Sequence, residues 1–257
     1  MTAEMFAPDS IDRVTPTLRP ADRTVMRQRW AHLLFLHWIV PPEQLLRLLP
    51  PGLELDTFEG NAYVGLVPFT MTGVRPVWAP ALPPLSDFHE TNVRTYVHRQ
   101  GKNPGIWFFS LDAANAIAVR IARAAWKLPY HFARMSLDRR EAEEGPTIAY
   151  ETRRLWPGPT PATCTVRYTP HGLVVPAPVG TREHFLAERY ILYAYRAGKL
   201  YSGQVNHVPY PLQQATVHEL SENLIAAAGI TRPDVAPIAH YAREVDVRIF
   251  PLKKQDF

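Results

Sequence analysis

The chain is poor in cysteine, and it lacks any apolar run long enough to cross a membrane. Cys164 is the single cysteine among 257 residues, which excludes an internal disulfide framework and fits a reducing compartment. The most apolar window, 30–40, contains two histidines and ends at Pro41, well short of the roughly 20 apolar residues of a transmembrane helix. The N-terminus has no basic region followed by an apolar segment, as a secretory signal would. We therefore expect a cytoplasmic protein that does not enter a membrane.

Motifs that mark the common enzyme sites are also missing. The sequence contains no HExxH, no GxSxG, no P-loop and no GxGxxG, so zinc-hydrolase, serine-hydrolase and nucleotide-binding functions lack their usual anchors. The ten histidines show no ligand spacing beside a carboxylate, so we expect no metal and no other cofactor. Cys164 sits on a predicted strand, where a small buried side chain is a better interpretation than a nucleophile. The net charge of +4 is spread without a basic arm, which argues against nucleic acid as a partner.

What the chain does have is the composition of a globular domain with many turns. Hydrophobic residues make up 46% and charged residues 20%, which is enough apolar side chain for a sizeable core. The 26 prolines are about twice the usual share, and their scatter favours short strands joined by turns. Residues 1–22 show no periodicity and carry three prolines, so we expect a tail or a strap. Residues 23–257 are expected to form one domain, because β-rich domains of this size occur as single units.

Hydrophobic periodicity predicts a β-rich α+β fold with a largely antiparallel, barrel-like sheet. In the central predicted helix Asp112 is available as the N-cap, and Ile117 and Ile121 lie one turn apart on the apolar face. The expected strands are 30–40, 62–71, 90–98, 105–111, 130–137, 148–155, 164–168, one on each side of 197–199, and 243–250; the expected helices are 41–49, the one that Asp112 would cap, 182–189 and 219–228.

The predicted strand 90–98 separates its side chains into two faces, because successive residues of a strand point to opposite sides. Glu90, Asn92 and Arg94 share one face, whereas the threonines and valines between them share the other. The threonine and valine face should pack on apolar neighbours. The Glu90 face either meets solvent or lines a polar cavity, in which a carboxylate and a guanidinium would orient a small polar ligand.

Four further side chains are candidates for binding or catalysis, and each has a structural alternative. Tyr130 and Arg134 share a face of the strand that begins at Tyr130, and a buried tyrosine needs only one hydrogen-bond partner to be satisfied in a core. Arg123 belongs to a basic stripe on the preceding helix, which is also the pattern of a solvated helix face. His207, just before a Pro-Tyr-Pro break, is a candidate base at a strand end, with a capping or hydrogen-bonded role as the alternative.

Four segments resemble, in their order and spacing, the YqjF-like family of uncharacterised conserved proteins, which looks like a branch of the acetoacetate decarboxylase-like superfamily. The segments begin RWAHLLFLHWIV, FHETNVRTYV, AWKLPYHFARM and FLAERYILYAY, and together they cover about Trp30 to Val217. The resemblance implies a cone-like antiparallel β-barrel with a central cavity and a few flanking helices.

The same resemblance implies which residues of the decarboxylase site this chain shares and which residue it lacks. In decarboxylase members a lysine follows the proline after this helix and forms a Schiff base with a keto acid. Aligning that proline with Pro129 puts Tyr130 at the reactive position, and a phenol cannot form an imine. Glu90 matches a glutamate that the decarboxylases place near their lysine, and Arg123 matches an arginine on the helix. Lys127 is the nearest other amine, and we expect it at the helix end rather than on the inward strand face.

These observations support one functional hypothesis with two alternatives. The chain would bind or act on a small carboxylated or carbonyl compound without a Schiff-base lysine. We expect this ligand to be an anion. Whether the protein is an enzyme stays open; if it is, Glu90 and Tyr130 would supply lyase-like or acid–base chemistry. The alternatives are a non-catalytic ligand-binding protein and a structural or interaction module whose cavity is filled by its own side chains; a homo-oligomer is compatible with each. The residues expected to hold the ligand are Arg94, Arg123, Asn92, Arg134 and His207.

Overall fold

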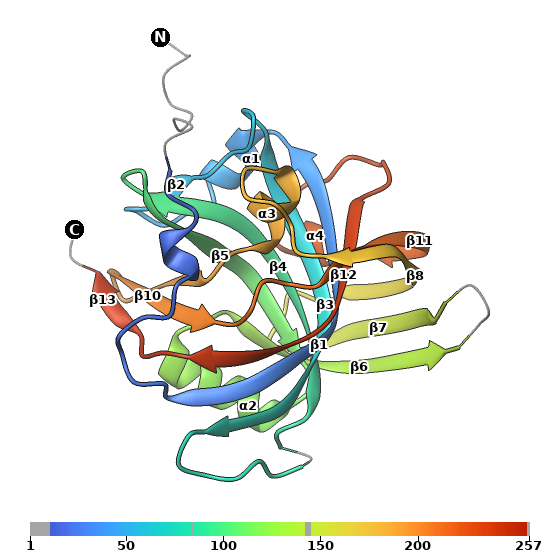
Figure 1. Ribbon diagram of the computed structural model, residues 1–257, viewed down its shortest axis with the longest axis horizontal. Helices are drawn as coiled ribbons and strands as arrows, with labels where there is room; N and C mark the ends of the chain where they lie inside the picture. The colour runs from blue at the N-terminus through green and yellow to red at the C-terminus, as the bar shows by residue number, and fades with distance from the viewer. Residues whose placement is uncertain (1–10, 84, 142–144, 256–257) are drawn as a thin grey trace.

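The computed structural model describes residues 11–83, 85–141 and 145–255, which form one sheet with short helices at its margins (Figure 1). The β-rich α+β fold is therefore confirmed. The strands are β1 (Met26–Val40), β2 (Glu54–Leu55), β3 (Ala62–Pro76), β4 (Phe88–Arg99), β5 (Lys102–Ala113), β6 (Tyr130–Arg140), β7 (Thr147–Trp156), β8 (Thr163–Val175), β9 (Ile191–Arg196), β10 (Lys199–Asn206), β11 (Leu212–Glu222), β12 (Ile238–Ile249) and β13 (Lys253–Gln255). The helices are η1 (Thr15–Thr17), α1 (Pro42–Leu46), α2 (Ala116–Ile121), the π-helical turn η2 (Ala122–Trp126), α3 (Arg182–Ala187) and α4 (Leu224–Ala227).

The strands follow the order β13-β10-β9-β5-β6-β7-β8-β11-β12-β1-β3-β4-β2. Further pairings join β4 to β5 and β10 to β12, so the succession of hydrogen-bonded strands closes on itself. Most neighbours are antiparallel, while β5 runs parallel to β6 and to β9. As a result β4 is flanked by β3 on one side and β5 on the other, and it has no free edge along most of its length.

Apolar side chains cover both sides of β1, β3 and β4, because the alternation of each strand sends one set of residues into each of two cores. The first core lies between these strands and β7, β8 and α4. It contains Leu34, Leu36, Val64, Val93, Ile148, Tyr150, Val166 and Leu224. The second core, which we call the inner core, contains Leu33, Phe35, Val67, Phe69, Ala113, Val119, Tyr190, Tyr210 and Val245.

The helix before Pro129 differs from the sequence-based expectation in its cap and in its buried face. Asn115 is the N-cap, and its side chain accepts from the backbone N–H groups of Ile117 and Ala118. The assignment of Asp112 as the cap was wrong, because Asp112 is the penultimate residue of β5. Ile117 and Ile121 were expected on the apolar face, yet they are 51% and 58% exposed, while Val119 is the buried residue of α2.

The helix expected at 219–228 was also only partly correct. Residues up to Glu222 continue β11, which pairs with β8 from Leu212 to Glu222, and only Leu224–Ala227 form α4. The expected strand around residues 243–250 is present as the second half of β12, and the strand at 62–71 continues to Pro76. Long-range pairing with β8 therefore overrode the local helical pattern around Glu219.

Residues 11–22 run along the outside of the domain, whereas residues 1–10 lie outside the described part of the chain. Nε2 of Gln204 donates to the backbone carbonyls of Pro16 and Leu18, and Nδ2 of Asn206 donates to that of Thr17. Arg13 forms an ion pair with the buried Asp56 at 2.5 Å. Among the described residues, no helix is both long and apolar enough to cross a membrane.

Candidate functional site

Glu90, Asn92 and Arg94 form a row on one side of β4, and all three are buried. The register of β4 with β3 places Glu90 opposite Phe69, which belongs to the inner core. On the other side of β4, Thr91 hydrogen-bonds to Thr152 of β7. Both sides of the strand are thus covered, and the alternative in which the Glu90 face meets solvent is wrong.

Tyr130 and Glu90 are joined by a hydrogen bond in which the phenol Oη donates to Oε2 of the carboxyl group at 2.8 Å. The two meet because β5 pairs with both strands: Asn92 of β4 is in register with Leu111, and Leu111 is in register with Tyr130. The predicted pair of candidate catalytic residues is therefore brought together by two strand pairings.

Burial of the Glu90 carboxyl raises its pKa to about 8, because desolvation disfavours the charged form. Hydrogen bonds from Tyr130 and Asn92 act in the opposite direction, while the charge of Asp112 adds to the increase. The pKa of Tyr130 is raised well above its ordinary value by burial and by Glu90. At neutral pH the pair therefore holds two exchangeable protons in a desolvated site, as acid–base groups require.

Arg94 and Asn92 carry buried polar atoms that lack partners. Nη2 of Arg94 donates to the carbonyl of Leu186 at 3.1 Å, and the guanidinium lies over the Phe35 ring at 5.4 Å. Nε of Arg94 and Oδ1 of Asn92 are buried and have no hydrogen-bond partner among the described residues. An unsatisfied buried polar group costs about 1–3 kcal/mol, so these two atoms require a physical explanation.

A buried ion pair that the sequence analysis missed lies close to the candidate catalytic pair. Arg154 of β7 donates from Nε and Nη2 to the two carboxylate oxygens of Asp112, both at 2.7 Å. The two side chains are at most 2% exposed. Asp112 was assigned to the helix cap because its partner is 42 residues away in the sequence, where no local pattern indicates it.

Arg123 contacts the candidate site through the backbone rather than through Glu90. Its Nη1 donates to the carbonyl oxygen of Tyr130 at 2.6 Å, and its guanidinium lies over the Trp156 ring at 5.8 Å. Lys127, at the end of η2, places Nζ 4.8 Å from the centre of the Tyr201 ring. Arg123 therefore positions the first residue of β6, and it does not reach a ligand beside Glu90 through the contacts described here.

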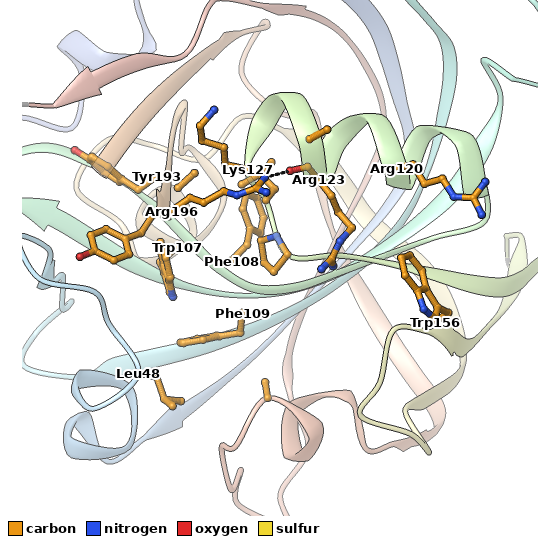
Figure 2. A pocket seen from close by; sticks show the side chains of 16 residues that line it. Leu48, Trp107, Phe108, Phe109, Arg120, Arg123, Lys127, Trp156, Tyr193 and Arg196 are labelled. Atoms are coloured by element: carbon orange, nitrogen blue, oxygen red, sulfur yellow. Dashed lines mark hydrogen bonds between the residues drawn. The ribbon is translucent and has the colours of Figure 1, made fainter. Parts of the chain in front are cut away.

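The side chains of Arg123 and Lys127 line an outer cavity of about 660 Å³ between η2, β5 and β9 (Figure 2). Trp107 and Phe109 of β5 also line this cavity, and Arg196 of β9 reaches the helix, where its Nη1 donates to the carbonyl of Arg123 at 2.7 Å. Neither Glu90 nor Tyr130 lines it. The basic stripe predicted on the helix thus faces a cavity that is separate from the Glu90 row.

Arg134 and His207 were expected at the same site; Arg134 is exposed, whereas His207 packs on Tyr210, whose ring contacts Phe35 beside Arg94. Arg134 keeps the strand face of Tyr130 but is exposed, opposite Arg153 of β7; Figure 1 shows these two strands side by side. His207 is buried against Tyr190, with ring centres 4.3 Å apart. Burial lowers the pKa of His207 to about 4, so the imidazole is neutral at physiological pH.

His207 belongs to a second group of buried titratable side chains that the sequence analysis did not identify. Tyr190 donates from Oη to Oε2 of Glu188 at 2.6 Å, and the backbone N–H of Tyr210 donates to Oε1 at 2.8 Å. Burial raises the pKa of Glu188. Because the Glu188 carboxyl is satisfied on both oxygens, we interpret this group as a structural clamp between α3 and the start of β11.

Solved structures with a similar fold are acetoacetate decarboxylase-like proteins. The enduracididine biosynthesis enzyme MppR with bound HEPES buffer has a TM-score of 0.64 at 12% identity, over 93% of this chain and 90% of that one. An acetoacetate decarboxylase-like enzyme from Sphingomonas wittichii RW1 has a TM-score of 0.61 at 14% identity, over 91% and 94% of the two chains. Acetoacetate decarboxylase from Legionella pneumophila has a TM-score of 0.59 at 14% identity, over 98% of both chains. At these identities the likeness establishes the fold alone.

The chain belongs to the DUF2071 family, whose members are described as uncharacterized conserved proteins and whose model matches residues 27–246. It is 39% identical over 231 residues to the uncharacterized protein YqjF of Bacillus subtilis strain 168, covering 90% of this chain and 92% of that protein. The resemblance to the YqjF-like family is therefore confirmed. Glu90, Tyr130 and His207 all lie within the matched range.

Proposed function

We propose that this protein binds a small compound with a carbonyl and a carboxylate group, an oxo acid, in the central cavity of a cone-like barrel beside the inner face of β4. One observation carries the proposal: a buried acid hydrogen-bonded to a phenol stands in one row with buried polar atoms of Asn92 and Arg94 that have no partner. A structural core satisfies such atoms, whereas a binding site leaves them for its ligand.

The residues of the row can divide the ligand between them. Strand geometry puts the Cα atoms of Glu90 and Arg94 roughly 13 Å apart, and both side chains lie on the same buried face of β4. Arg94 would hold the carboxylate through Nε, as guanidinium groups do in charge-assisted pairs. Glu90, protonated near neutral pH, would donate to the carbonyl oxygen, and Tyr130 would keep that carboxyl oriented.

Chemistry without an imine fits the positions of the amines. The chain has five lysines, and Lys127, the one nearest the site in sequence, lies over Tyr201 at the outer cavity. If the protein is an enzyme, Glu90 and Tyr130 would therefore act by proton transfer on the carbonyl compound, in a lyase-like or related reaction. Among the proteins of similar fold, MppR has been solved with pyruvate, which makes pyruvate the first ligand to test.

Non-catalytic binding is the second candidate function. Non-catalytic binding is favoured because Glu90 and Tyr130 do not line the outer cavity. They also do not line a second cavity, which is bordered by Arg27 and Arg248. In that arrangement the same residues would hold a ligand whose entry requires the side chains to move, and turnover would not follow.

The test is calorimetric titration of pyruvate and acetoacetate into the wild-type chain and into Tyr130→Phe and Arg94→Gln, followed by NMR detection of product or of deuterium exchange next to the carbonyl. We expect Arg94→Gln to weaken binding about tenfold or more, since it removes charged hydrogen bonds. Tyr195→Phe, on β9 outside the row, is the matched control. Turnover that Tyr130→Phe abolishes while binding remains supports catalysis. Binding without turnover supports the second candidate, and binding that Arg94→Gln leaves unchanged contradicts the proposed site.

A further inference from the structure

Three arginines stand directly opposite one another on three neighbouring strands. Arg27 of β1 is in register with Arg248 of β12 on one side and with Arg75 of β3 on the other. Side chains directly opposite in antiparallel strands have Cβ atoms about 5 Å apart, and like charges in such positions are destabilising. No carboxylate of the described residues forms an ion pair with any of the three, so the repulsion in this arginine row is not compensated within the chain as described.

The adjacent register pair shows what compensation looks like on the same strands. Arg29 of β1 is opposite Asp246 of β12, and its Nε donates to Oδ1 of that carboxylate at 2.8 Å. Glu244 approaches the same guanidinium at 3.9 Å. The sheet therefore pairs charges of opposite sign at one position and sets three like charges together two residues away. That contrast indicates a counter-ion from outside the chain.

The arginine row lines a cavity of about 720 Å³ that also contains Asn206 and His207. The cavity lies where β10 and β12 separate. These strands pair only through Val205 with Ile249 and Asn206 with Arg248, and the chain then leaves the sheet at His207. Asn206 is in register with Arg248 and so stands at the end of the row, where its Nδ2 also donates to the carbonyl of Thr17 at 3.3 Å.

His207, one of the residues that line this cavity, has a buried ring nitrogen without a partner. The side chain is 6% exposed, its Nδ1–H donates to the carbonyl of Val208 at 2.6 Å, and Nε2 has no partner among the described residues. With Nδ1 acting as the donor, Nε2 of the neutral ring carries a lone pair. It is therefore an acceptor that a hydroxyl group of a ligand would satisfy.

We propose that this cavity is a second binding site, separate from Glu90, for a small molecule that carries a phosphate or diphosphate group. The strand positions of Arg75, Arg27 and Arg248 form a line about 10 Å long, and Nη1 of Arg75 also donates to the carbonyl of Gly73 at 3.1 Å. Three arginines at this spacing match several phosphate oxygens better than one carboxylate. The volume lies within the usual range for small-molecule sites, and the compact row lacks the extended basic surface that nucleic acid requires.

The site is independent of the proposed function, because the arginine row and the Glu90 row lie on different parts of the sheet. Arg27 and Arg29 alternate with Gln28 and Trp30, and Trp30 is the residue that packs on the inner core, against Phe69. The arginines therefore point to the outside of β1. Loss of oxo-acid binding at Glu90 would leave the phosphate site untouched, and the reverse also holds.

The experiment uses the whole chain and pyrophosphate as the probe, with inorganic phosphate and a short single-stranded RNA as comparisons, all at constant ionic strength. Binding is measured by calorimetry, and the melting temperature is recorded with and without the probe. We expect pyrophosphate to bind wild type and raise its melting temperature. Arg27→Gln should weaken binding about tenfold or more and, because it removes the central like charge, should leave the unliganded protein as stable as wild type or more stable. Arg243→Gln, an exposed arginine elsewhere on β12, is the matched control.

Four results would overturn the proposal. One is pyrophosphate failing to bind wild type at millimolar concentration. Another is an equal loss of affinity in Arg27→Gln and Arg243→Gln, which would show attraction by net charge alone. The third is tight binding of the RNA with none of pyrophosphate, which would make the row part of a nucleic-acid surface. Asn206→Ala gives a second, uncharged test at the end of the row, and retained affinity there together with retained affinity in Arg27→Gln also contradicts the site.

Discussion

The hydroxyl of Tyr130 donates to the Glu90 carboxyl at 2.8 Å, inside a part of the fold where the carboxyl is 3% exposed. The phenol is the donor, so the hydrogen bond stabilises the carboxylate form, but desolvation outweighs it and leaves the pKa of Glu90 at about 8. The carboxyl group is thus held neutral near physiological pH by burial, and a small change in its surroundings shifts its charge.

Glu90 should make the protein less stable as the pH rises from about 4.5 to about 8. Unfolded Glu90 ionises near its ordinary pKa of 4.5, whereas the folded group keeps its proton up to about 8, so the folded state binds more protons throughout that window. The free energy of unfolding should fall by at most about 5 kcal/mol across it. Urea denaturation at a series of pH values measures the slope.

Glu90→Gln should flatten that slope, because the amide does not titrate and still accepts the Tyr130 hydrogen bond. The Glu90→Gln variant should still show a smaller decrease of stability with pH, because the pKa of Glu188 is also raised. Glu151→Gln, an exposed glutamate on β7, is the control and should follow wild type. A Glu90→Gln variant with the full wild-type slope would show that Glu90 titrates normally.

The buried pair of Asp112 and Arg154 should be more costly to break than to replace. Arg154→Met leaves the Asp112 carboxylate buried without its two hydrogen bonds, and we expect a loss of about 3–5 kcal/mol in the free energy of unfolding. The double variant Asp112→Leu, Arg154→Met removes both charges and should recover at least half of that loss.

Chemical denaturation of the two single variants and the double variant measures the coupling directly. The exposed pair of Asp138 and Arg140 supplies the matched control, and Arg140→Met should change the free energy of unfolding by less than about 1 kcal/mol. Additive effects of the Asp112 and Arg154 substitutions would contradict a buried, coupled pair.

Asp56 forms ion pairs with Arg13 of the N-terminal segment and with Arg189, and the two pairs should differ in how much they stabilise the fold. Its Oδ2 accepts from Arg189 at 2.7 Å, and that arginine side chain is 1% exposed, while Arg13 is 20% exposed. Asp56→Asn leaves a buried guanidinium without its charge partner and should cost about 3 kcal/mol. Arg13→Gln should cost less than about 1 kcal/mol but speed tryptic cleavage after Arg23, because it releases a contact of the N-terminal segment. Equal stability losses would contradict this division.

The Glu90 row was predictable from the sequence, because strand alternation is local. A period of two residues put Glu90, Asn92 and Arg94 on one side and the threonines and valines on the other, as the structure has them. What alternation could not decide was whether solvent or protein covers the row. That depends on β1 and β3, which bring Phe35 and Phe69 to it from segments 20 to 60 residues away.

The errors have the same physical origin. Asp112 and Asn115 are both good helix caps, and only the distant Arg154 decides which of them caps α2. Glu219 lies in a segment with a helical pattern, but its partner Arg167 on β8 is 52 residues away and holds it in a strand. The arginine row was invisible for the same reason, since Arg27, Arg75 and Arg248 meet only through strand register.

The absence of Schiff-base chemistry can be tested by treating the protein with borohydride and pyruvate or acetoacetate and weighing the intact chain. Wild type should gain no mass, because Tyr130 cannot form an imine and Lys127 lies against Tyr201 rather than beside Glu90. Tyr130→Lys is the positive control: an amine at that position would stand within reach of Glu90 in an apolar site, where part of it is neutral and nucleophilic. An adduct on this variant and none on wild type supports an acid–base site, whereas a wild-type adduct mapped to Lys127 contradicts it.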